Sequence, residues 1–443
     1  MTDLAAPAPT VAPGYIAAGP VWTRADLGLV SVLVVLLVLT QRIGLPTSDS
    51  VISVAIPLTY AFAGIWLARR LLVVSRLRVA LFGAAASACL LATVAVSLSG
   101  LASQFSMTSL FLLIAIYVPW VLRVRGAQGA VVVARAGHTF VWTMLAVSVV
   151  GIAQLGAQLV GVWEWQDYLK DALGNYRVPG YNYDNALAYG VGTYKGTGFV
   201  LLEPSFLSQY CALAILIGVM LRVRAWKLLV LAGGLASAVS GTGIILLAVG
   251  AVLLLLRAPR RLRPGYVVVG AAGVAMLIYS PVSKFLLDRQ NEVTTEGTSG
   301  NARFVAPYQE AWHGLLADPA RFFVGAGPGS VERVIPGERV SVDGGDVLYS
   351  VIPKLVFEYG VIAAGLFVLF LVLSILDRAP WRVIPAALVV MVFVLSGALL
   401  QPQTACLVWL LSGIGAISSR ERAEPSAAAL SAEPSARADL GAG

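Results

Sequence analysis

Charged residues are scarce in this sequence of 443 residues. Asp, Glu, Lys and Arg together make up only 12% of the chain, whereas hydrophobic residues make up 58%. A typical soluble domain has about 25% charged residues, so this chain has too few to cover a surface exposed to water. The composition therefore excludes an ordinary soluble protein and favours one that is embedded in a membrane.

Cysteine and histidine are also rare. The three cysteines, Cys89, Cys211 and Cys406, all lie in apolar segments, which predicts small buried side chains and no disulfide. The chain has two histidines, and no His/Cys spacing typical of a zinc site occurs. It also lacks the glycine motifs that bind nucleotide phosphates. We therefore expect no metal ion and no cofactor.

Long apolar segments, in contrast, are abundant. A helix needs roughly 20 mainly apolar residues to cross a bilayer, and about twelve segments approach that length. The predicted spans are 26–43, 50–68, 79–98, 104–122, 138–162, 203–221, 226–239, 241–256, 265–283, 354–376, 382–400 and 402–418. The sequence SGTG at 240–243 is either a turn or a kink within one helix, and we favour a turn between two helices.

Positive charge alternates along the chain. Basic residues follow every even-numbered span: Arg69, Arg70, Arg76 and Arg78; Arg123, Arg125 and Arg135; Arg222, Arg224 and Lys227; Arg257, Arg260, Arg261 and Arg263; Arg378 and Arg382; Arg420 and Arg422. Short cytoplasmic loops carry an excess of Lys and Arg, so both termini are predicted to be cytoplasmic. The net charge of +8 reflects this topology and not nucleic-acid binding.

The topology divides the chain into seven regions. A disordered cytoplasmic tail (1–25) is followed by spans 1–5 (26–162), an outer loop (163–202), spans 6–9 (203–283), a large outer loop (284–353), spans 10–12 (354–418) and a second disordered cytoplasmic tail (419–443). The large loop contains NARFVAPYQEAWHGLLADP from 301 onwards, whose apolar residues have helical spacing. This segment predicts an amphipathic helix on the membrane surface, ended by Asp318 and Pro319.

The first outer loop is dense in Tyr, Trp and Asn, residue types that suit sugar binding. Tyr181 and Tyr183, with Arg177 and Lys195, are the candidate substrate-binding residues there. The alternative is a loop that packs on lipid headgroups. Glu203 then opens the sixth span, where a carboxylate is either a helix cap or, as an ionisable residue at the mouth of a membrane helix, a functional group.

The second outer loop supplies the remaining candidates. Arg303 is predicted at the start of the amphipathic helix, where a cation gains nothing from the helix dipole. That position indicates another partner, either phosphate or a surface carboxylate. Arginine holds phosphate oxygens with two donors at once. The other candidates in this loop are Arg289, Arg339, Asp343, Asp346 and Tyr349.

Four motifs at these positions resemble the O-antigen polymerase and O-antigen ligase superfamily of bacterial membrane glycosyltransferases. They are GTGFVLLEPSFLSQY (196–210), Arg303 with Trp312 nine residues later, the run from Asp318-Pro319 to GAGPGS (325–330), and YSVIPKLVFEYGVIAAGLF (349–367). Family members often carry a His before the helix that follows the large loop, whereas this chain reads VDGGDVLYS there. This departure favours a polymerase over a ligase.

The resemblance implies an all-α, GT-C-like polytopic fold in the bacterial inner membrane, with its active site on the periplasmic face. The implied reaction joins repeat units carried on undecaprenyl diphosphate, without a metal. Arg303 would stabilise the leaving diphosphate, and Glu203, Asp343 or Asp346 would accept the acceptor proton. Membrane lipids and a chain-length regulator protein are the expected partners. A ligase, or a lipid or polysaccharide transporter, is the alternative.

Overall fold

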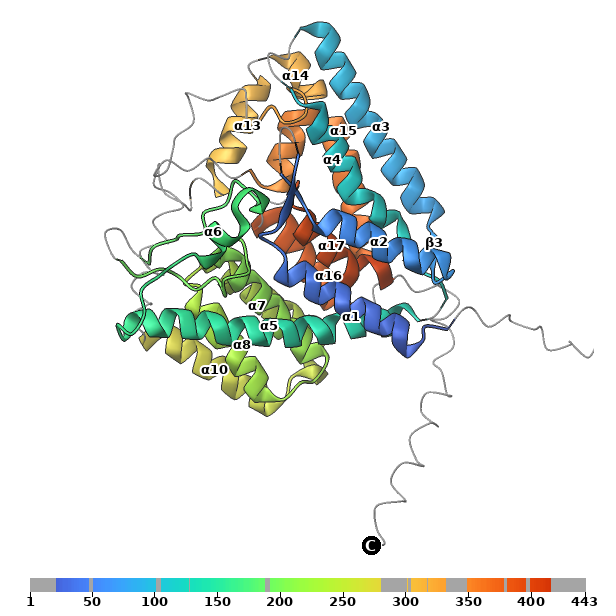
Figure 1. Cartoon of the computed structure of the whole chain (residues 1–443). Coiled ribbons are helices and arrows are strands. Elements are labelled where there is room, and N and C mark those ends of the chain that lie inside the picture. The colour runs from blue at the N-terminus through green and yellow to red at the C-terminus, as the bar shows by residue number, and fades with distance from the viewer. Residues whose placement is uncertain are drawn as a thin grey trace, which may run out of the picture.

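The structure is a computed structural model of the chain. It describes residues 21–47, 51–100, 105–126, 128–187, 192–279, 301, 304–316, 318–331, 349–377, 381–395 and 399–415. This described part is mostly helical, with few strands (Figure 1). The expectation of a helical protein is therefore confirmed.

Each predicted span corresponds to one helix. The helices are α1 (Arg24–Leu39), α2 (Ala55–Ala68), α3 (Arg76–Ser99), α4 (Met107–Tyr117), α5 (Gly129–Leu159), α6 (Tyr168–Leu173), α7 (Pro204–Met220), α8 (Ala225–Ser237), α9 (Gly241–Arg257), α10 (Pro264–Tyr279), α13 (Ala306–Leu316), α14 (Pro319–Val324), α15 (Val351–Leu376), α16 (Val383–Val390) and α17 (Pro402–Leu411). Since α8 ends at Ser237 and α9 begins at Gly241, the prediction of two helices is confirmed, but the turn lies at 238–240 and residues 241–243 already belong to α9.

Several helix boundaries differ from the prediction, and the differences at α5 and at Asp318 have a clear cause. The helix α5 begins at Gly129, nine residues before the predicted span at 138. The basic Arg135 marked the end of the apolar window, but an exposed arginine is compatible with continued helix. Asp318, which was predicted to end the amphipathic helix, also begins the next one. Its side chain accepts a hydrogen bond from the backbone N–H of Ala320 (2.9 Å) and so caps α14.

Three of the described helices, α3, α5 and α15, are long and apolar enough to cross a membrane. Six further apolar segments have 10–17 residues: α2, α4 extended to Val121, α7, α8, α9, and α16 extended by a π-helical turn to Leu395. At 1.5 Å per residue, 17 residues span about 26 Å, slightly less than the hydrocarbon core. The chain is therefore associated with a membrane, and the total of twelve spans stays a prediction.

Four short strands were not predicted. Strands β1 (Gly44–Pro46) and β2 (Val51–Ser53) form one antiparallel pair after α1. Strands β3 (Leu72–Val74) and β4 (Leu122–Val124) form another, which joins the segments that follow α2 and α4. Each strand has three residues, too few for an alternating pattern to be recognised in the sequence.

Helix ends that the charge pattern assigns to one side lie together. Arg78, in the first turn of α3, donates hydrogen bonds to the carbonyl oxygen of Gly413 after α17 (2.7 Å) and to Asp377 after α15 (3.2 Å). The start of α1 is tied to the start of α5 by Gln128, which accepts a hydrogen bond from the backbone of Trp22. In Figure 1, α6 and α13 lie on the left, whereas β3 and the start of α1 lie on the right.

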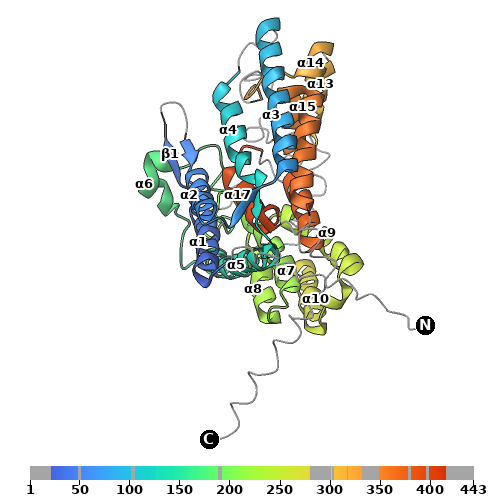
Figure 2. The same ribbon diagram turned by 90° about the vertical axis from the view of Figure 1, so that its right-hand side faces the viewer.

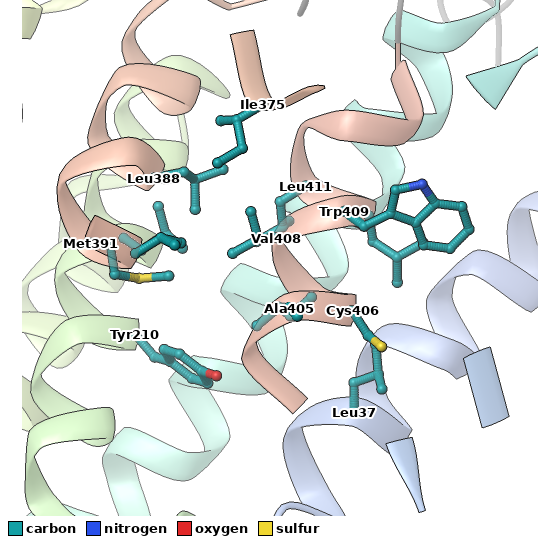
Figure 3. Packing of buried hydrophobic residues seen from close by; sticks show 14 of the residues in the cluster. Leu37, Tyr210, Ile375, Leu388, Met391, Ala405, Cys406, Val408, Trp409 and Leu411 are labelled. Atoms are coloured by element: carbon teal, nitrogen blue, oxygen red, sulfur yellow. The ribbon is translucent and has the colours of Figure 1, made fainter. Parts of the chain in front are cut away.

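One continuous apolar core holds these helices together. The helix α17 runs through its centre, and every residue from Pro402 to Leu411 is buried. Leu37, Tyr210 and Met391, from three other helices, pack around it (Figure 3). A helix that is apolar on all sides belongs in the interior of a bundle. To one side of this core, α3 and α15 lie side by side, and α13 and α14 pack against α15 (Figure 2).

Candidate functional site

Two arginines share one buried carboxylate in the first polar segment. Arg42, which follows α1, donates from Nη1 to Oδ1 of Asp167 (2.7 Å). Arg177 lies with Nη2 3.1 Å from the other oxygen, Oδ2. Tyr183 completes the group, because its ring centroid lies 4.4 Å from the Arg42 guanidinium and 3.9 Å from that of Arg177. We call Arg42, Asp167, Arg177 and Tyr183 the arginine cluster.

The cluster carries more positive than negative charge, since two guanidinium groups face one carboxylate. Arg42 is only 1% exposed and also donates to the carbonyl oxygen of Leu201 (2.9 Å), so its charge is held in place by protein groups. The Arg177 side chain is 21% exposed, and its Nε has no hydrogen-bond partner in the described part of the chain. Because that Nε is itself buried, it is the exposed part of the side chain, and not Nε, that makes Arg177 the member of the cluster an anion can reach.

Glu203 lies beside this cluster, because its carboxylate contacts the backbone of Asn182, which precedes Tyr183 in the chain. It occupies the N-cap position of α7 in an extended conformation, but its side chain makes no capping hydrogen bond to the helix backbone. Its carboxylate accepts instead from the backbone N–H of Asn182 (3.3 Å) and from the Ser205 hydroxyl (3.1 Å). The residue is 5% exposed. The geometry thus disagrees with a simple cap and leaves the functional interpretation open.

A chain of buried polar side chains leads away from Glu203. Tyr181 is close enough for its pKa to respond to Glu203, and it hydrogen-bonds to Gln401. Gln401 accepts from Thr404, Thr404 contacts the Tyr210 hydroxyl, and that hydroxyl accepts from Gln41 (3.0 Å). Burial raises the pKa of Tyr181 and of Tyr183, and the Tyr183 hydroxyl donates to the carbonyl oxygen of Val178 (2.6 Å).

The GTG sequence at 196–198 explains how the first resemblance motif positions these groups. Oε1 of Gln154, on α5, accepts from the backbone N–H groups of Thr197 (2.9 Å) and Gly198 (3.0 Å). Gly198 has φ +64°, and a Cβ there would overlap a methyl group of Val147. Only glycine fits this backbone. The tight turn brings the Leu201 carbonyl to Arg42 and Glu203 to the start of α7.

Two other resemblance motifs meet at a break in α15. Gly360 has φ 72° and ψ 173°, so the helix is interrupted there. The freed carbonyl oxygens of Phe357 and Glu358 accept from the backbone N–H groups of Ala326 (2.8 Å) and Gly327 (2.9 Å). The GAGPGS turn therefore satisfies the backbone of the EYG segment. One turn earlier, Lys354 and Glu358 form a buried ion pair at 3.5 Å.

The structure brings together only some of the predicted site residues. Arg177, Tyr181, Tyr183 and Glu203 lie in or beside the arginine cluster. Tyr349 lies elsewhere, in a small second core where its hydroxyl donates to Glu310. The Lys195 backbone N–H donates to Asn185 (2.9 Å), at the edge of the same loop. Outside the described residues lie Arg289, Arg303, Arg339, Asp343 and Asp346.

Sequence reasoning missed Arg42 and Asp167. Arg42 carried a usable signal, because it is a basic residue at the outer end of a predicted span (26–43), where an ionisable residue is a functional candidate. The helix in fact ends at Leu39, which leaves Arg42 in a turn beyond it. Asp167 had no comparable signal, since one acidic residue in a polar loop is ordinary.

Within the described ranges, no group of three His, Cys, Asp or Glu side chains is placed to hold a metal ion. No protein-family model matches the chain, and no curated protein matches it. The resemblance to the O-antigen polymerase and ligase superfamily therefore stays a prediction from motifs.

Proposed function

We propose that this membrane protein is a glycosyltransferase that joins glycan repeat units carried on undecaprenyl diphosphate. The observation that supports it most is the arginine cluster beside Glu203. Arg177, whose side chain is partly exposed, and Glu203, whose carboxylate is buried, are linked through the segment 177–183. A cation for a diphosphate and an oxygen base for a hydroxyl are the two groups that the reaction needs.

In the proposed reaction, the acceptor hydroxyl attacks the anomeric carbon of the donor sugar. The bond between that carbon and the diphosphate oxygen breaks, and the lipid diphosphate leaves with the electron pair. Arg177, with Arg303, stabilises its negative charge. Glu203 takes the hydroxyl proton, and the ring of Tyr183, whose hydroxyl already donates to the Val178 carbonyl, holds the guanidinium of Arg177 in position.

The test uses the purified full-length protein with lipid-linked donor and a metal chelator. Glu203→Gln should lower turnover by on the order of a hundredfold, because the amide cannot accept the proton, while donor binding stays nearly unchanged. Arg303→Ala should abolish assembly, with partial rescue by Lys, which lacks the planar fork. Lys170→Gln, an exposed lysine on α6, is the matched control and should be fully active.

Near-normal turnover of Glu203→Gln would transfer the base role to Asp343 or Asp346, or to no protein group. Full activity of a correctly inserted Arg303→Ala variant would refute the role of Arg303. A ligase would use the same site with another acceptor, so assays with a second repeat unit and with a lipid A core acceptor separate the two enzymes.

A transporter is favoured by one specific observation. The break at Gly360 and the buried pair Lys354–Glu358 lie in α15, which is long enough to cross a membrane. Broken helices and buried charges are typical of transporter sites. A transporter forms no glycosidic bond, so polymer formation by the detergent-solubilised protein, where no second compartment exists, would exclude it as the sole function.

A further inference from the structure

A second group of basic and aromatic side chains lies at the other end of α5. Lys227, near the start of α8, has its Nζ 3.6 Å from the ring centroid of Trp142 and 5.7 Å from that of Trp226. The ring of His138 lies 6.4 Å from Trp142, edge to face. With Arg135, these residues form what we call the α5–α8 patch. It is remote from the arginine cluster, because Arg135 and Gln154 are 19 residues apart on α5, about 28 Å.

The patch faces outward from the protein. Arg135, His138 and Trp142 follow one another at spacings of three and four residues, which places them on one face of α5. Trp142 is 47% exposed and Trp226 is 51% exposed. Apolar side chains continue this surface on both helices, since Val131 and Leu229 are also about half exposed. Cationic groups are therefore set in an uncovered apolar face.

Within the described residues, no carboxylate neutralises the positive charge of the patch. Arg135 donates from Nε to the hydroxyl of Ser31 (2.7 Å), which is a neutral partner. In the part of the chain that the structure describes, neither Arg135 nor Lys227 forms an ion pair with a carboxylate. The segments 128–142 and 221–230 contain no Asp or Glu, and Arg222 and Arg224 add further positive charge.

We propose that the α5–α8 patch binds the phosphate of an anionic phospholipid. Lys227 and Arg135 hold the headgroup, and the indoles of Trp142 and Trp226 cover the glycerol and upper acyl chains. A free phosphate would leave these indoles and their apolar neighbours uncovered, whereas a lipid covers both kinds of surface. Aromatic and basic side chains together are characteristic of the membrane interface.

The length of α5 agrees with this position. Trp142 lies 17 residues before the end of α5 at Leu159, which corresponds to about 26 Å. Beyond that end, Trp163 and Trp165 pack on Phe199 at centroid distances of 5.9 and 5.8 Å. Between the two aromatic groups, the exposed residues of α5 include Val149, Val150 and Ile152. The two groups are thus about one hydrocarbon thickness apart, as interfacial belts on opposite faces are.

The experiment titrates dioleoylphosphatidylglycerol into the full-length protein in a neutral detergent and counts bound lipid by native mass spectrometry. Arg135→Gln and Lys227→Gln should each raise the apparent dissociation constant about fivefold, and together about 25-fold, since each basic side chain near an anionic lipid contributes a similar energy. Lys227→Arg keeps the charge and should keep the affinity. Lys170→Gln, an exposed lysine on α6, should bind like the wild type.

Three outcomes would overturn the proposal. The first is that the wild type and the double variant bind phosphatidylglycerol with equal affinity, and the second is that the wild type binds phosphatidylcholine as well as phosphatidylglycerol. The third is that millimolar inorganic phosphate displaces all bound lipid, which would make the patch a site for free anions. The melting temperature in lipid-free detergent is measured for every variant. Arg135 is exposed, and Lys227, although half-buried, forms no ion pair within the described residues, so these values should stay close to that of the wild type, and lost binding then reports on the site itself.

Discussion

Asp167→Asn tests the central contact of the arginine cluster. The Asp167 side chain is 4% exposed and holds the fully buried Arg42 at 2.7 Å and Arg177 at 3.1 Å. The substitution keeps the shape of the side chain but leaves two guanidinium groups without a counter-charge. Removing one partner of a buried ion pair costs about 3–5 kcal/mol, because the remaining charge stays out of water. We expect a loss near the lower end, since Arg177 can turn towards solvent.

The measurement is thermal unfolding of the purified protein in detergent, followed by intrinsic fluorescence. Asp167→Asn should lower the melting temperature by several degrees. The double variant with Arg42→Gln should recover part of the loss, because no buried charge is then left unpaired, and a coupling of this kind identifies a direct contact. Asp171→Asn, four residues later and exposed on α6, is the control and should change stability by less than about 0.5 kcal/mol.

Equal melting temperatures for Asp167→Asn and Asp171→Asn would refute the reasoning. Such a result would mean that Arg42 finds water or another acceptor when the carboxylate is removed. A double variant no more stable than the sum of its single changes would likewise show that Arg42 and Asp167 act independently.

Three further predictions concern the packing. Gly360→Ala should lower the melting temperature, because φ is 72° and a Cβ would overlap the Phe323 carbonyl. Gly365→Ala, in open space on the same helix, is the control and should be neutral or stabilising by about 0.5–1 kcal/mol. Arg78→Met should lower the free energy of unfolding by roughly 3–5 kcal/mol in thermal unfolding, because Asp377 and the Gly413 carbonyl then lose their buried hydrogen-bond donor. The control Arg76→Met, at an exposed position, should change it little. Tyr183→Phe should lose about 1 kcal/mol with its hydrogen bond to Val178, and Tyr183→Leu should lose more, because the ring between the two arginines is then gone.

The helices were predictable because membrane association requires continuous apolar runs, and such runs are visible without any partner. The segments around α3 and α15 illustrate this, since their predicted and observed bounds agree within three residues. The boundary of α5 was missed because hydropathy ends at Arg135 whereas backbone hydrogen bonding does not. The strands β1 to β4 were missed because three-residue pairs are created by the proximity of distant segments.

The candidate site was only partly predictable for a similar reason. Glu203 stood out as an ionisable residue at the start of an apolar segment, and Arg177 as a basic residue in a loop dense in Tyr, Trp and Asn. Nothing in the local sequence connects Arg42 to Asp167, because 125 residues separate them. Tyr349 was a candidate of the second loop, but the packing of α13 against α15 places Glu310, on α13, where it accepts from the Tyr349 hydroxyl.

The sequence by itself determined that the chain is helical and membrane-associated, that its basic residues recur after alternate apolar segments, and that its polar residues are concentrated in two segments. Local composition suffices for these properties, because transfer of each segment from water to lipid depends on its own side chains. Tertiary structure alone decided which polar side chains meet. Pairing Arg42 with Asp167, and the GAGPGS turn with the broken α15, requires helices far apart in sequence to pack first. A buried charge or a freed carbonyl is stable only where that packing supplies its partner.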